Sequence, residues 1–70
     1  MFNHNELRGR IVARYGSQAD FAKAFGVSEN TFSLKMNNKV RFTTDDIIKI
    51  VAMLEIPINE IGTYFFTEEV

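Results

Sequence analysis

Apolar residues recur three and four positions apart in four stretches of the chain, which is the period of an amphipathic α-helix. We expect helices over residues 4–15, 18–25, 29–37 and 44–54, and Pro57 suits the first turn of a short fifth helix that ends near Gly62. Residues 63–70, which include Tyr64, Phe65 and Phe66, fit a short strand or an irregular cover on the core. The pattern predicts an all-α fold, a compact bundle of four to five short helices in one domain over residues 1–70. The residues expected to face inward are Leu7, Ile11, Val12, Tyr15, Phe21, Ala22, Phe25, Phe32, Met36, Ile47, Ile50, Val51 and Leu54.

A repeated capping pattern supports the expected helix starts. A Ser, Thr or Asn side chain before a helix can accept a hydrogen bond from a free N–H of the first turn. An acid three residues later completes a capping box, and flanking apolar residues form a hydrophobic staple. The expected caps are Asn3, Ser17, Ser28 and Thr43, the acids are Glu6, Asp20 and Asp46, and the staples are Phe2–Leu7, Val27–Phe32 and Phe42–Ile47.

The second and third expected helices are joined by a very short turn. Only Gly26 and Val27 separate the end of one from the cap of the next, and Gly26 can take the left-handed conformation of a tight turn. Together with Gln18, Ala22 and Phe32, these residues form the frame of a helix-turn-helix over about residues 18–37. Gly9, inside the first helix, either allows a close helix contact or is a tolerated defect.

The composition offers little for catalysis. The chain has 70 residues, no Cys and one His, and it contains no Gly-rich phosphate loop. We therefore expect no enzymatic activity, no catalytic residue, no metal and no cofactor, with His4 as a first-turn surface residue. No apolar run approaches the ~20 residues that span a bilayer, and the N-terminus lacks a signal-peptide pattern. We expect a cytoplasmic protein without a membrane partner.

Charge is distributed unevenly along the chain, although the formal net charge is only −1. Residues 8–41 carry seven bases and two acids, a net charge of about +5, whereas residues 42–70 carry one base and six acids, about −5. Such asymmetry suggests an anion-binding face opposite an acidic body.

The residues 18–38, QADFAKAFGVSENTFSLKMNN, resemble the helix-turn-helix of the Cro/C1-type (phage-repressor-like, XRE-type) regulators. The flanking LRGRIVARYGS and IPINEIGTYFF are similar to small phage- or prophage-encoded members of that group. The resemblance implies a lambda-repressor-like DNA-binding domain. One departure is Lys35, which stands where the motif is often apolar.

Helical geometry indicates which side chains would meet DNA. With Phe32 and Met36 inward, Asn30, Leu34 and Asn37 lie on the outward stripe of the third helix, which a recognition helix presents to the major groove. Amides, hydroxyls and carboxylates there can bond to base edges, and an aliphatic group can contact a thymine methyl. The expected base-reading residues are Glu29, Asn30, Ser33, Leu34 and Asn37. The expected phosphate contacts, from cations and helix starts, are Gln18, Ser28, Lys35, Asn38, Lys39 and Arg41.

Two functions of different classes follow from this helix. The first is a sequence-specific transcriptional regulator, a repressor-like protein that binds double-stranded operator DNA as a homodimer. Its dimer contact would be the apolar tail, unless the tail closes the core. The alternative is an antirepressor or modulator that binds a phage repressor protein through its helix-turn-helix face. The acidic net charge, Glu29 at the start of the reading helix and the outward Leu34 keep that alternative open. An antitoxin role is a further option that the sequence does not exclude.

Overall fold

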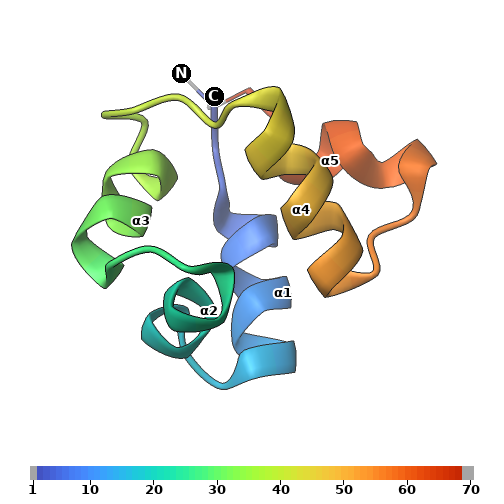
Figure 1. The fold of residues 1–70 in the computed structure, drawn as a ribbon. Coiled ribbons are helices and arrows are strands. Elements are labelled where there is room, and N and C mark those ends of the chain that lie inside the picture. Colours follow the sequence, from blue (N-terminus) through green and yellow to red (C-terminus); the bar gives the residue numbers. More distant parts are fainter. Residues whose placement is uncertain (1, 69–70) are drawn as a thin grey trace.

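The computed structural model describes residues 2–68, and in them it confirms the all-helical fold (Figure 1). In Figure 1, α1 lies at the centre, with α3 on one side of it and α4 and α5 on the other. Within residues 2–68, no helix is long and apolar enough to cross a bilayer. The elements are α1 (Asn5–Tyr15), α2 (Gln18–Phe25), α3 (Glu29–Met36), α4 (Thr44–Leu54), a 3₁₀ turn (Ile58–Glu60) and α5 (Ile61–Phe65).

The helix bounds agree with the expected ones except near the C-terminus. The second and fourth helices have the predicted bounds, and α1 and α3 each differ by one residue at one end. The prediction that the last helix ends near Gly62 is wrong, because α5 continues to Phe65 and buries Tyr64 and Phe65. The expected strand or irregular cover is likewise replaced by helix up to that residue, and residues 69–70 lie outside the described part.

The predicted caps at Ser17, Ser28 and Thr43 are confirmed, since each side chain accepts a backbone N–H of the first turn. At Thr43 the capping box is complete, because the Asp46 carboxylate also accepts the backbone N–H of Thr43 at 3.0 Å. The Asn3 side chain accepts from the backbone N–H of Asn5 at 2.8 Å, although His4 occupies the cap position of α1. Local hydrogen bonds therefore fix most helix starts.

A chain of aromatic rings runs through the core and connects α2, α3 and α5. Phe32 lies 5.4 Å from Phe21, 5.9 Å from Phe25 and 6.1 Å from Phe42, measured between ring centroids. Phe42 in turn lies 5.5 Å from Phe65. The buried hydrophobic residues are Leu7, Ile11, Phe21, Ala22, Phe25, Phe32, Met36, Ile50, Leu54, Ile56, Tyr64 and Phe65. Among the residues expected to face inward, the prediction for Val12 is wrong, because this residue is 46% exposed.

His4 is buried, so its prediction as a surface residue is also wrong. Its Nδ1 lies 3.0 Å from the backbone oxygen of Met36, and its ring packs edge-on against Phe42 with centroids 5.3 Å apart. His4 thus joins the start of α1 to the end of α3. A buried polar ring of this kind requires a hydrogen-bond partner, and Met36 supplies one.

The N-terminal segment is tied to the C-terminal segment and to the loop after α3. The backbone N–H of Asn3 donates to the carbonyl of Thr67 at 2.7 Å, and Phe2 forms an isolated antiparallel bridge with Glu68. The Asn38 amide donates to the carbonyl of Phe2 at 2.7 Å. These bonds bring together three parts of the chain that are distant in sequence.

Two glycines allow a matched test of backbone conformation. Gly9 lies inside α1 with nothing within 4 Å of an added Cβ, so the structure favours the tolerated defect over a close helix contact. Gly26 has a φ of +103°, which L-residues rarely adopt. We expect Gly9→Ala to stabilise the fold by about 0.5–1 kcal/mol and Gly26→Ala to destabilise it by about 1–2 kcal/mol. Urea denaturation checks both values, and equal effects of the two substitutions would contradict the assignment.

Candidate protein-interaction surface

Helix α3 is held against the core by its turn and by two inward side chains. Gly26 takes the left-handed conformation, and the N–H groups of Gly26 and Val27 both donate to the carbonyl of Ala22. Phe32 and Met36 are buried. The tight turn between α2 and α3 is therefore built as the sequence indicates, and the opposite face of α3 points to solvent.

The outward face of α3 carries a neutral stripe with one acid beside it. Asn30, Leu34 and Asn37 are exposed, as predicted, and so is Glu29, whereas Ser33 is half-buried. The Leu34 side chain is 38% exposed. The loop after the helix folds back on it, since the N–H groups of Lys39 and Val40 both donate to the carbonyl of Leu34. Val40 is also exposed, so a second aliphatic side chain lies close in the structure to the end of α3.

Lys35, the one cation within α3, is paired inside the protein. Its Nζ donates to the Asp46 carboxylate at the start of α4, and the Lys35 and Asp46 side chains are only 13% and 16% exposed. Burial acts to raise the pKa of Asp46, but the hydrogen bond from Lys35, those from Thr43 and the Lys35 charge together lower it below its ordinary value. A phosphate contact of Lys35, as predicted, would require this pair to open, and the structure does not test it. Lys35 connects α3 to α4.

Other cations are also used within the fold. Arg10 donates to the carbonyls of Leu54 and Glu55 at 2.9–3.1 Å, at the end of α4, where carbonyls lack helical partners. Arg14 forms an ion pair with the Glu55 carboxylate, and Lys49 donates to the carbonyl of Phe25 at 2.6 Å, at the end of α2. Bases in residues 8–41 thus bond to groups in residues 42–70 across the fold. Two of the seven bases of residues 8–41, Arg14 and Lys35, form ion pairs with acids of residues 42–70, so part of the predicted cationic charge is neutralised.

Several predicted DNA contacts have structural partners. The Ser28 hydroxyl caps α3, and the Asn37 amide donates to the Ser33 hydroxyl at 3.2 Å. Asn38 adopts a left-handed conformation with φ of 62° and holds Phe2. Gln18 is half-buried in the first turn of α2, and Lys39 and Arg41 are exposed in the loop after α3. The DNA-contact roles assigned to these residues are not tested by the structure and remain predictions.

Sequence reasoning missed Val40 and the pairing of Lys35. Val40 stands among polar residues in a loop, where periodicity gives no signal. For Lys35 a signal existed, because a cation at a position that is usually apolar requires a nearby acid. Asp46, already expected as the acid of a capping box, is that partner.

The Lys35–Asp46 pair predicts a specific acid response. A carboxylate whose pKa is lowered in the folded state contributes stability above its unfolded pKa of about 3.9, and this contribution is lost as the pH falls through the folded pKa. We expect Asp46→Asn to cost on the order of 1–3 kcal/mol at pH 7 and to lose less further stability at pH 3 than the parent protein does. Asp45→Asn, at the exposed neighbouring acid, is the matched control. Urea midpoints at both pH values measure the difference. An identical loss on acidification in both variants would refute the assignment.

Comparisons with known proteins point to a phage context. The model of a family described as "Protein of unknown function (DUF739)" matches residues 1–68. Among solved structures, the chain is similar to the modulator of repression (MOR) of the temperate bacteriophage TP901-1 from Lactococcus lactis, solved in solution. The two are 43% identical with a TM-score of 0.83, and the match covers 93% of this chain and 88% of that chain. A search among curated proteins gave no match.

These findings overturn the resemblance to Cro/C1-type regulators. The resemblance took in nearly the whole chain, but its motif, residues 18–38, is short, whereas the family model matches residues 1–68 and the structural match covers 93% of this chain. That segment describes how α2 and α3 pack, through Ala22, Gly26 and Phe32. Such packing residues carry no information on what the outward face of α3 binds. The all-helical fold is confirmed by the helical match.

Proposed function

This chain belongs to the DUF739 family, and from its likeness to a phage modulator of repression we propose that it modulates repression by binding a phage repressor protein. The binding surface is the outward face of α3 with Leu34 at its centre. By occupying the reading surface of the repressor, the protein lowers the affinity of that repressor for its operator.

The observation that carries this proposal is the charge of α3. Affinity for DNA comes largely from cations that neutralise phosphates, but the one lysine of the helix is bound to Asp46. The same face presents Glu29 and the partly exposed Leu34. A neutral-to-acidic surface with an aliphatic centre and few charges is suited to a protein partner.

Two purified repressors serve as test partners: the one encoded beside the gene for this chain and the repressor of bacteriophage TP901-1. Calorimetric titration of the chain into each measures binding, and fluorescence anisotropy of labelled operator DNA measures the consequence. We expect binding to at least the first repressor, release of its operator as the chain is added, and no anisotropy change when the chain meets operator DNA alone. Sequence-specific binding of operator by the chain alone, with no binding of either repressor, would refute the proposal and favour a direct DNA-binding regulator.

A further inference from the structure

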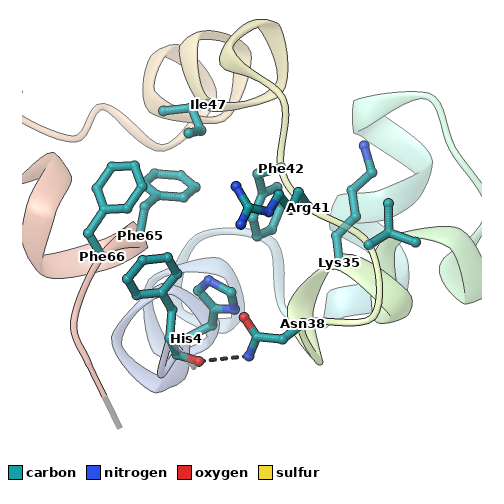
Figure 2. A pocket seen from close by; sticks show the side chains of 10 residues that line it. His4, Lys35, Asn38, Arg41, Phe42, Ile47, Phe65 and Phe66 are labelled. Atoms are coloured by element: carbon teal, nitrogen blue, oxygen red, sulfur yellow. Dashed lines mark hydrogen bonds between the residues drawn. The ribbon is translucent and has the colours of Figure 1, made fainter.

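A pocket of about 450 Å³ lies between the N-terminal segment, the loop after α3 and the end of α5 (Figure 2). Its walls are mainly apolar and come from distant parts of the chain. Figure 2 shows Phe65 and Phe66 on one side, Ile47 above and Phe42 beside Arg41. The apolar lining residues are Phe2, Val40, Phe42, Ile47, Phe65 and Phe66.

The polar groups that line the pocket are engaged elsewhere, with one exception. His4 bonds to Met36, Asn38 to Phe2, and Lys35 to Asp46. Arg41 is exposed and has no hydrogen bond or ion pair with any residue of the described segment 2–68. In Figure 2 its guanidinium is directed toward the side of the pocket where Phe65 and Phe66 lie, whereas the Lys35 amine points away. Among residues 2–68 no acid lines the pocket, so the described walls combine apolar side chains with one unpaired cation.

We propose that this pocket receives, from the repressor, a segment in which a large apolar side chain stands next to a carboxylate. This inference rests on the proposed function and adds a second contact to it. A cavity of about 150 Å³ already holds a benzene ring, so the volume here accepts one or two large side chains. The Arg41 guanidinium can bind a carboxylate in bidentate geometry, and within residues 2–68 no acid lines the pocket to compete for it.

The pocket and the outward face of α3 are held together as one surface. The N–H groups of Lys39 and Val40 bond to the carbonyl of Leu34, so the loop that carries Arg41 is fixed to the end of α3. Val40, one of these two donors, also lines the pocket. One partner can therefore cover Leu34 and insert a side chain beside Arg41. DNA phosphates would contact Arg41 but would leave the phenylalanine walls unfilled.

The probe is the capped peptide Ac-Glu-Phe-Leu-NH2, titrated into the 15N-labelled chain at millimolar concentration and followed by NMR chemical shifts. We expect shifts at Asn38, Arg41 and Phe65, and weaker ones with Ac-Lys-Phe-Leu-NH2. Arg41→Glu should weaken binding of the acidic peptide by about 10-fold and reverse the preference. Lys23→Glu, at an exposed lysine of α2 outside the pocket, is the matched control and should change neither.

The other occupants give different outcomes, and each would overturn the inference. Equal shifts with both peptides, or none, would exclude a charge-selective pocket. Shifts at Arg41 with inorganic phosphate or duplex DNA, but not with the acidic peptide, would indicate a phosphate contact. Self-association in sedimentation runs that Arg41→Glu abolishes would indicate a second copy of the chain.

Repressor affinity distinguishes the role of the pocket from the role of the outward face of α3. If a repressor binds the parent chain and the Arg41→Glu variant equally, the pocket inference is wrong and the function of α3 stands. If neither repressor binds the parent chain, the proposed function is wrong. We expect Arg41→Glu to lower repressor affinity about 10-fold without abolishing it.

Discussion

Replacing Leu34 by Lys is expected to weaken binding of the repressor by about 30-fold or more, the effect of losing a hot-spot contact of about 2 kcal/mol. The substitution places an ammonium group where an aliphatic side chain would be desolvated in the complex. Leu34 is 38% exposed and lies on the face of α3 opposite Phe32 and Met36, so the fold should tolerate the change. Calorimetric titration against the repressor measures the loss.

The chain offers a matched control at Ile58, which is 84% exposed in the 3₁₀ turn before α5. Ile58→Lys makes the same chemical change at a site remote in sequence from α3 and should leave repressor affinity unchanged. Circular dichroism should show both variants folded. If Leu34→Lys keeps its repressor affinity and instead gains affinity for DNA, the outward face of α3 is not a protein-binding surface.

The second large effect is on stability, at Phe32. This residue is fully buried, and its ring contacts three other aromatic rings, Phe21, Phe25 and Phe42. Phe32→Ala removes those contacts and leaves a cavity, at a cost of about 3–5 kcal/mol. A domain of this size has a total stability of only about 4–10 kcal/mol, so much of it would be lost. Thermal and urea denaturation followed by circular dichroism measure the change.

Phe66→Ala is the corresponding control, because Phe66 is 50% exposed and packs mainly on Phe2 and Phe65. We expect it to cost no more than about 1 kcal/mol, the value of an aromatic pair. Equal destabilisation by the two substitutions would mean that the aromatic chain through Phe32 does not hold α2 and α3 together.

The parts of the fold that depend on neighbouring residues could be predicted from the sequence. The start of α4 rests on Thr43 and Asp46, three positions apart, and the α2–α3 turn rests on Gly26. Several missed features join residues far apart in sequence. His4 is buried because Met36, thirty-two positions later, supplies its partner. Neither helical period nor capping pattern contains such a contact.

In the candidate site, too, the local features could be predicted from the sequence and the long-range contacts could not. The outward positions of α3 followed from helical geometry, and Asn30, Leu34 and Asn37 are exposed as predicted. The character of that surface did not follow, because it depends on whether Lys35 is free. From the sequence, Lys35 was expected to contact a phosphate, whereas in the structure its Nζ bonds to Asp46. The pocket beside Arg41 is likewise assembled from both ends of the chain and one loop.

The ion pairs that Arg14 and Lys35 form across the fold also affect how the protein meets other molecules at a distance. Opposite charges that lie in contact cancel each other's field well within the Debye length, about 8 Å at physiological salt. With a formal net charge of only −1, we expect weak electrostatic steering and an association rate constant near the neutral range of about 10⁵–10⁶ M⁻¹s⁻¹. Residence time, set by short-range contacts such as the one at Leu34, then decides how long a repressor stays bound.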